Sequence, residues 1–121
     1  SRVEPLDSPD AQVSMRAPLC GSTIQVELCI KKGRVSRFGQ NIKACALGQA
    51  AASVLAAHVI GKSAEDILAV RDQVRDMLAD KGPSPDGDWS ALAALAPAKD
   101  AKSRHGAILL PFNAVLKAFA S

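Results

Sequence analysis

Aromatic side chains are scarce in this chain: they make up 3% of the residues, and tyrosine is absent. Proteins that bind single-stranded nucleic acid stack the bases on aromatic side chains, so the composition argues against such a platform and against an aromatic-lined sugar site. Cysteine is also rare. The three cysteines are an odd number and form no CxxC pair, which argues against a secreted disulfide scaffold and against a four-cysteine zinc ribbon.

The length of 121 residues leaves room for one compact domain. Because 22 of the hydrophobic residues are alanine, the large apolar side chains suffice for a single modest core. The net charge of +3 is too small for a nucleic-acid footprint. Basic side chains are in excess in residues 1–45 and 99–121, whereas acidic side chains are in excess in residues 46–98.

No segment of the sequence is typical of a membrane or export signal. The stretch from Ser1 to Met15 carries three acidic side chains and no apolar run, unlike a signal peptide. The uncharged run over residues 44–60 consists mostly of small residues and is short for a bilayer span. We therefore expect a soluble, cytoplasmic protein.

The first part of the chain predicts strands. Residues 1–17 are polar and contain two prolines, so we expect a flexible N-terminal arm, followed by a single domain over residues 18–121. Apolar and polar residues alternate over residues 23–30, the period of a half-buried strand. After a turn at residues 31–34, Val35 and Phe38 are out of phase, which predicts a bulge or a break into two short strands.

The rest of the chain predicts helices. The apolar period changes at Ala46, and Gly61 provides a helix stop. Ser63 is a candidate N-cap for a second helix. Asp88 is a candidate N-cap for a short helix before Pro97, and a last helix is expected after the basic residues 99–104. Strands followed by helices predict an α+β fold, with an antiparallel sheet of three strands and helices packed on one face.

Two cysteines and a histidine are the strongest candidates for chemistry. Cys20 lies in a turn before the first strand, and Cys45 lies where the small-residue helix begins, so that the helix N-terminus can stabilise its thiolate. His105, in the basic segment before the last helix, can reach the same end of the sheet. Two thiolates and an imidazole are a ligand set for zinc or iron with one position open.

A purely structural interpretation of these residues also stands. Free cysteines are often small buried hydrophobic residues, and a loop histidine is more often solvated. Cys29 alternates with polar residues on the outer face of its strand and is interpreted as incidental. His58 lies on an apolar helix face and is interpreted as a packed histidine.

The sequence resembles the U-type iron–sulfur cluster assembly scaffolds, the family of IscU, SufU and the N-terminal domain of NifU. The resemblance is carried by Pro-Leu-Cys-Gly at residues 18–21, by Ala-Cys at residues 44–45 and by Gly-Lys-Ser at residues 61–63. It covers residues 17–70 and 99–119, and the long middle segment is most similar to the SufU branch. The resemblance implies a three-stranded antiparallel sheet with helices on one face.

The family pattern places three cysteines and one aspartate around a metal or a nascent cluster. By this resemblance Cys20 and Cys45 match the first two cysteines, and Ser22 stands at the position of the aspartate. The third cysteine falls at Gly106 or Ala107 and is absent, while His105 matches the histidine that precedes it in IscU proteins. The resemblance therefore implies a site formed by Cys20, Cys45 and His105, with Ser22 as a weaker ligand.

Three functions follow from this resemblance. The leading one is a scaffold, not an enzyme, that binds iron, an iron–sulfur cluster or zinc and passes it to an apo-protein recipient, as a monomer or weak dimer. The second is a zinc-dependent sulfur acceptor that works with a cysteine desulfurase; the missing third cysteine counts against it. The third is a metal-free interaction module that retains only the fold. We expect no nucleic-acid or membrane partner.

Overall fold

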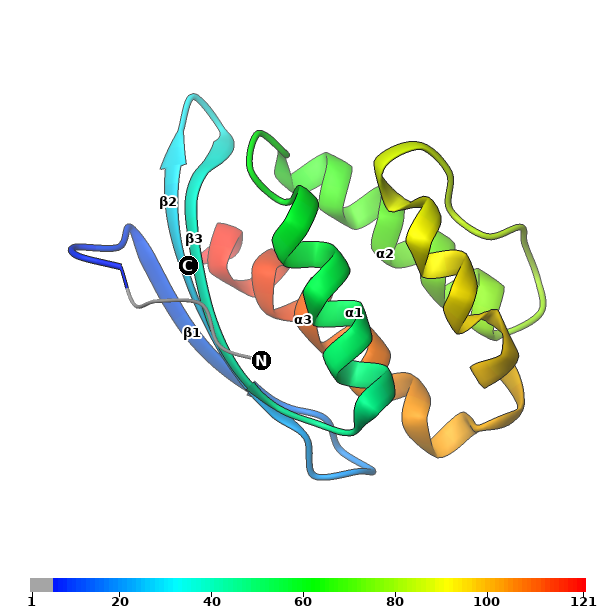
Figure 1. The fold of residues 1–121 in the computed structure, drawn as a ribbon. Helices are drawn as coiled ribbons and strands as arrows, with labels where there is room; N and C mark the ends of the chain where they lie inside the picture. Colours follow the sequence, from blue (N-terminus) through cyan, green and yellow to red (C-terminus); the bar gives the residue numbers. More distant parts are fainter. Residues whose placement is uncertain (1–5) are drawn as a thin grey trace.

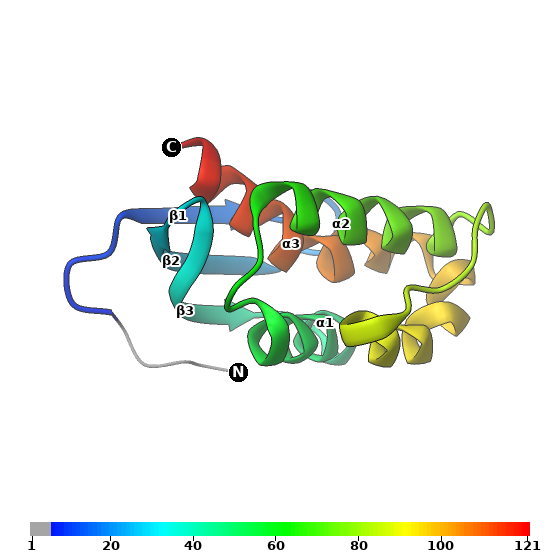
Figure 2. The ribbon, with the colours of Figure 1, turned by 90° about the horizontal axis from the view of Figure 1, so that it is seen from above.

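A computed structural model describes residues 6–121 of the chain. Three antiparallel strands in the order β1-β2-β3 form one sheet, and the helices cover one face of it (Figures 1 and 2). The expected α+β fold is confirmed. The elements are β1 (Ala11–Arg16), β2 (Thr23–Lys31), β3 (Arg34–Lys43), α1 (Ala46–His58), α2 (Ala64–Leu78), the 3₁₀ segments η1 (Gly87–Asp100) and η2 (Lys102–Arg104), and α3 (His105–Ala120).

Strand β1 forms where the sequence predicted part of the N-terminal arm. Ala11 and Val13 are buried and alternate with exposed polar residues, so the segment has the period of a half-buried strand. It pairs with β2 from Ala11↔Leu28 to Arg16↔Thr23. The arm predicted for residues 1–17 is therefore too long, and its residues 1–5 lie outside the described part of the chain.

Strands β2 and β3 contain the bulge that the sequence predicted. The register changes from Cys29↔Arg37 to Ile30↔Val35, which leaves Ser36 as the extra residue of β3. The Ser36 hydroxyl donates to the carbonyl oxygen of Cys29 at 3.0 Å. At the other end of the sheet Thr23 is paired with Lys43, so β1, β2 and β3 all terminate close together there.

The helices begin close to the expected residues. Ser63 and Asp66 form a reciprocal capping box at the start of α2, in which each side chain accepts from the other residue's amide. The cap of the segment before Pro97 was predicted wrongly: η1 starts after Asp86, and Asp88 lies in its first turn. The physical reason is an ion pair, since the Asp88 carboxylate binds Lys62 Nζ at 2.8 Å.

The core lies between the sheet and the helices. Helix α3 packs against β1, β2, α1 and α2, and α1 packs against β3, so α3 is the central helix of the layer (Figure 2). Its Ile108, Phe112 and Val115 are fully buried. Among the helices of residues 6–121, none is both long and apolar enough to cross a membrane.

Candidate functional site

The candidate site is at the end of the sheet where β1 and β3 finish and β2 starts. Cys20 lies in the β1–β2 loop, Cys45 is the N-cap residue of α1, and Arg104 is the N-cap residue of α3. Helix α3 also reaches this end of the sheet. Its Gly106 lies so close to the end of β1 that a Cβ added there would be 3.6 Å from Ala17 Cβ. Three separate chain segments therefore meet at the positions that the sequence predicted.

Cys20 and Ser22 form a hydrogen-bonded pair within the β1–β2 loop. Cys20 Sγ and Ser22 Oγ are 3.2 Å apart, and Ser22 is 5% exposed. The hydroxyl and the backbone N–H of Ser22 lower the pKa of the Cys20 thiol, because both stabilise its charged form. Ser22, which stands where the family pattern has an aspartate, thus lowers the pKa of Cys20 but adds no negative charge to the site.

Cys45 is held by the N-terminus of α1 and by a cation from α3. Burial raises the pKa of its thiol, but the N–H of Gly48, the Arg104 guanidinium and the N–H of Leu47 outweigh that effect, so the pKa is lowered. Unpaired amides at a helix N-terminus and a nearby cation both favour a thiolate. Cys45 therefore has the electrostatic surroundings of a reactive or metal-binding cysteine.

The two thiols lie near each other and are both free. The charge of Cys45 raises the pKa of Cys20, an effect that acts only between neighbouring groups. Neither cysteine is in a disulfide, and both are partly exposed. The structure thus brings together two of the residues that the sequence singled out.

The His105 ring has a partner of its own. As the first residue of α3, His105 places Nε2 2.9 Å from the carbonyl oxygen of Ala98. Because a carbonyl only accepts, Nε2 carries a proton, so in the neutral ring Nδ1 is the nitrogen with a free lone pair. Within residues 6–121 no group of three histidine, cysteine or acidic side chains is arranged to hold a metal ion, so His105 does not join the two thiols in this conformation.

Gly106 and Ala107, the two positions at which the resemblance places a third cysteine, differ in their surroundings. At Gly106 an added Cβ would meet Ala17 Cβ at 3.6 Å and Pro18 Cδ at 3.9 Å, both ordinary contacts, beside the loop that carries Cys20. Ala107 is fully buried and faces Gly48 of α1. Of the two positions, Gly106 is therefore the one beside the loop that carries Cys20.

The other two residues discussed from sequence lie away from the site. Cys29 is in the middle of β2, paired with Arg37. His58, at the end of α1, makes an edge-to-face contact with Trp89, with ring centroids 6.0 Å apart. Sequence reasoning treated Arg104 only as part of a basic segment; its place directly before His105 was the one available signal for its role.

Comparisons with known proteins identify the family and the fold of this chain. A family model described as the NifU-like N-terminal domain matches residues 2–104. The crystal structure of a nitrogen-fixing NifU-like protein (N-terminal) from Brucella abortus is 42% identical, with a TM-score of 0.91, over 95% of this chain and 80% of that one. No match is found among curated protein sequences.

Two more distant structures share the fold. One, described only as a hypothetical protein, is 23% identical, with a TM-score of 0.85 over 96% of this chain and 85% of that one. The other is a candidate iron–sulfur cluster assembly scaffold protein for the SUF system from Fervidobacterium islandicum. It is 16% identical, with a TM-score of 0.83 over 94% of this chain and 83% of that one. With the family match and the Brucella relative, the chain belongs to the NifU-like N-terminal domain family.

Proposed function

We propose that this protein is an iron–sulfur cluster assembly scaffold that holds iron or a nascent cluster on the thiolates of Cys20 and Cys45. The observation that carries the proposal is the meeting of these two thiols, each with a lowered pKa, at one end of the sheet. Membership of the NifU-like family supports it, as does the SUF-system scaffold structure of the same fold. The cargo would be bound and passed on to an apo-protein recipient.

The two thiolates of this site are half of the ligands that a common iron–sulfur cluster needs. Iron–sulfur clusters of the common types are held by four cysteine thiolates, and this chain offers two at the site. Ser22 and His105 are the candidates for further ligands from the same chain, and a second copy of the chain could supply two more thiolates. Since Nε2 of His105 donates to Ala98, a His105 ligand would use Nδ1.

Arg104 changes the charge of this site. The resemblance implies an aspartate where this chain has Ser22, so one negative charge is missing, and the Arg104 guanidinium adds a positive charge beside Cys45. A cation close to thiolates stabilises them before the metal arrives and offsets the negative charge of a thiolate-bound cluster. Arg104 is therefore proposed as a positioning residue for Cys45 and not as a ligand.

Anaerobic reconstitution tests the proposal. The protein is incubated with ferrous iron and sulfide, desalted, and examined by visible absorption and by iron and sulfide analysis. Cys20→Ser and Cys45→Ser should each remove most of the bound iron, and Cys29→Ser should retain it as the matched control. Equal iron content in all four proteins, or none in the wild type, would show that the two thiols are not the binding groups.

A second candidate is a sulfur acceptor for a cysteine desulfurase, with zinc as the alternative metal. It is favoured by the stabilised thiolate of Cys45, since a thiolate is the form that attacks sulfur. The Cys45 thiolate would attack the terminal sulfur of the desulfurase persulfide and release the desulfurase thiolate. Mass spectrometry after incubation with a desulfurase and cysteine should then show an added sulfur on Cys45. Its absence there would reject this candidate.

A further inference from the structure

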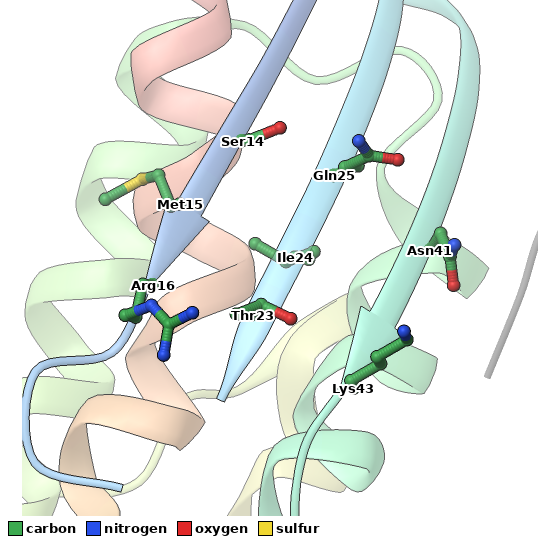
Figure 3. A pocket seen from close by; sticks show the side chains of 8 residues that line it. All are labelled: Ser14, Met15, Arg16, Thr23, Ile24, Gln25, Asn41 and Lys43. Atoms are coloured by element: carbon green, nitrogen blue, oxygen red, sulfur yellow. The ribbon is translucent and has the colours of Figure 1, made fainter. Parts of the chain in front are cut away.

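The outer face of the sheet, away from the helices, is hollowed near the end that carries the cysteines. This outer-face hollow is lined by polar side chains from all three strands (Figure 3). The polar ones are Ser14 and Arg16 of β1, Thr23 and Gln25 of β2, and Asn41 and Lys43 of β3, and the apolar Met15 and Ile24 complete the lining. Because no helix packs on this face (Figure 1), the polar lining side chains face solvent.

The strand register sorts these side chains into two rows. Arg16, Thr23 and Lys43 form the row at the strand ends, and the next row along the strands contains Ser14, Gln25 and Asn41. Figure 3 shows the same arrangement, with a cation at each side and the Thr23 hydroxyl between them. Two strand spacings separate the Arg16 and Lys43 backbones by about 10 Å.

In the part of the chain that the structure describes, the two cations of the hollow have no acidic partner. Within residues 6–121 neither Arg16 nor Lys43 is in an ion pair, and none of the eight lining residues is acidic. The acidic residue of the neighbouring row, Glu27, is instead occupied by the N–H of Leu6 at 2.8 Å and by the Gln12 amide. Among the described residues, the hollow therefore offers a ligand two cations, two hydroxyls and two amides.

We propose that the outer-face hollow binds a small polycarboxylate anion. Arg16 presents a planar guanidinium, which pairs with a carboxylate through two parallel hydrogen bonds, and Lys43 presents a compact ammonium to a second carboxylate. The hydroxyls and amides between the two cations match the polar middle of such a molecule. A compound with two or three carboxylates, such as citrate, can contact both sides of the hollow at once, whereas a monocarboxylate cannot.

The charge and size of the hollow favour a small ligand. The two cations of the hollow are a small electrostatic footprint for a nucleic acid, which needs many phosphate contacts. The hollow is also next to the candidate site, since Lys43 is two residues before Cys45. Its ligand needs neither cysteine, however, so the proposal stands independently of the scaffold function.

A titration followed by ¹⁵N NMR tests the proposal with citrate as the probe. Citrate should shift the amide signals of residues 14–16, 23–25 and 41–43 at physiological salt, and acetate should shift them much less. The double variant Arg16→Gln/Lys43→Gln should weaken citrate binding by at least about tenfold, because two charge-assisted contacts are lost. Lys31→Gln/Lys32→Gln, with the same loss of charge at the far end of the sheet, should leave it unchanged.

Three results would overturn the proposal. One is citrate binding that the two double variants weaken equally, which would mean a general charge effect. The second is inorganic phosphate or a short single-stranded DNA that shifts the same signals at lower concentration than citrate. The third is the absence of any shift in residues 14–16, 23–25 and 41–43. All of these measurements use metal-free Cys20→Ser/Cys45→Ser protein in parallel, so failure of the scaffold function leaves the test intact.

Discussion

The Arg104 guanidinium stabilises the thiolate of Cys45, and the two residues occupy the N-terminal caps of different helices, α3 and α1. Both helix N-termini therefore face the same small region. Positive helix ends and a fixed cation together create a place where anionic sulfur is favoured. In this chain the segment that would carry a third cysteine carries a cation instead.

Replacing Arg104 by glutamine should raise the pKa of Cys45. The guanidinium lowers that pKa both through hydrogen bonding and through its charge, and glutamine lacks the charge. Alkylation by iodoacetamide requires the thiolate, so the pH midpoint of Cys45 alkylation should move to higher pH and the rate at pH 7 should fall severalfold. Mass spectrometry of the Cys45 peptide over a pH series measures both quantities.

Lys102→Gln is the matched control, because Lys102 is an exposed cation two residues away that is not among the main causes of the lowered Cys45 pKa. Its pH profile should coincide with that of the wild type. If the two variants shift the Cys45 profile equally, the effect comes from the general positive charge of this segment and not from the contact between Arg104 and Cys45.

Introducing a third thiol at position 106 should strengthen metal binding. An added Cβ at Gly106 makes only ordinary contacts with Ala17 and Pro18, and it faces the loop of Cys20. Gly106→Cys should therefore increase the affinity for Co²⁺ by at least about tenfold, since even changes outside the ligand set alter metal affinity by that amount. The thiolate-to-cobalt absorption band, titrated anaerobically, measures the affinity and reports the number of thiolates.

Ala107→Cys is the comparison variant for the increase in Co²⁺ affinity expected of Gly106→Cys. Ala107 is fully buried against α1, so a thiol there should add nothing to the cobalt spectrum. A stronger cobalt band in Ala107→Cys than in Gly106→Cys would mean that α3 is rotated relative to the orientation described above.

Local patterns explain how much of the fold could be predicted. The alternation in β2, the bulge opposite Cys29 and the N-cap at Ser63 each depend on a few neighbouring residues, and each was confirmed. Strand β1 was missed because its alternation is short and it follows a polar stretch with two prolines. The fold class was confirmed because helix and strand periods differ so clearly.

The candidate site was harder to predict because its contacts are tertiary. The spacing and surroundings of Cys20 and Cys45 indicated both residues, and the strand register brought them together. The contact of Arg104 with Cys45 depends on how α3 packs against α1, which no local pattern specifies. The partner of His105 is a backbone carbonyl of η1, and the irregular course of that segment could not be inferred from its composition.

The capping box of α2 should make stability depend on Asp66. The Ser63 N–H donates to Asp66 Oδ2 at 3.0 Å, and this hydrogen bond is the main reason why the pKa of Asp66 is lowered. Asp66→Ala should reduce the free energy of unfolding by about 1 kcal/mol at pH 7, the usual cost of losing a helix cap. Urea unfolding followed by circular dichroism measures it.

The pH dependence of this effect has a definite sign. A carboxylate whose pKa is lowered on folding stabilises the protein above its unfolded pKa, about 4, and that stabilisation is lost as the pH falls through the folded pKa. The difference between wild type and Asp66→Ala should therefore shrink below about pH 4. Glu65→Ala, at an exposed neighbour outside the capping box, should have a smaller effect; equal losses at every pH would argue against the capping box.

Gly48 should be intolerant of even one methyl group, because α1 and α3 approach closely at this residue. A Cβ added there would lie 2.8 Å from Ala44 Cβ and 3.2 Å from the carbonyl oxygen of Ala107. Glycine to alanine in a helix normally stabilises by about 1 kcal/mol, but overpacking of a filled core costs about 1–3 kcal/mol. Gly48→Ala should therefore lower the free energy of unfolding in urea.

A double variant separates crowding from any other effect of Gly48→Ala. Removing the closest obstacle with Ala44→Gly should restore part of the lost stability, because the contact at 2.8 Å disappears while the one with the Ala107 carbonyl remains. The effects of the two substitutions should then be non-additive, as expected for residues in contact. Strictly additive effects, or a Gly48→Ala protein more stable than the wild type, would show that α1 can move away from α3 at little cost. The N–H of Gly48 that stabilises the Cys45 thiolate would then belong to a mobile helix end and not to a fixed site.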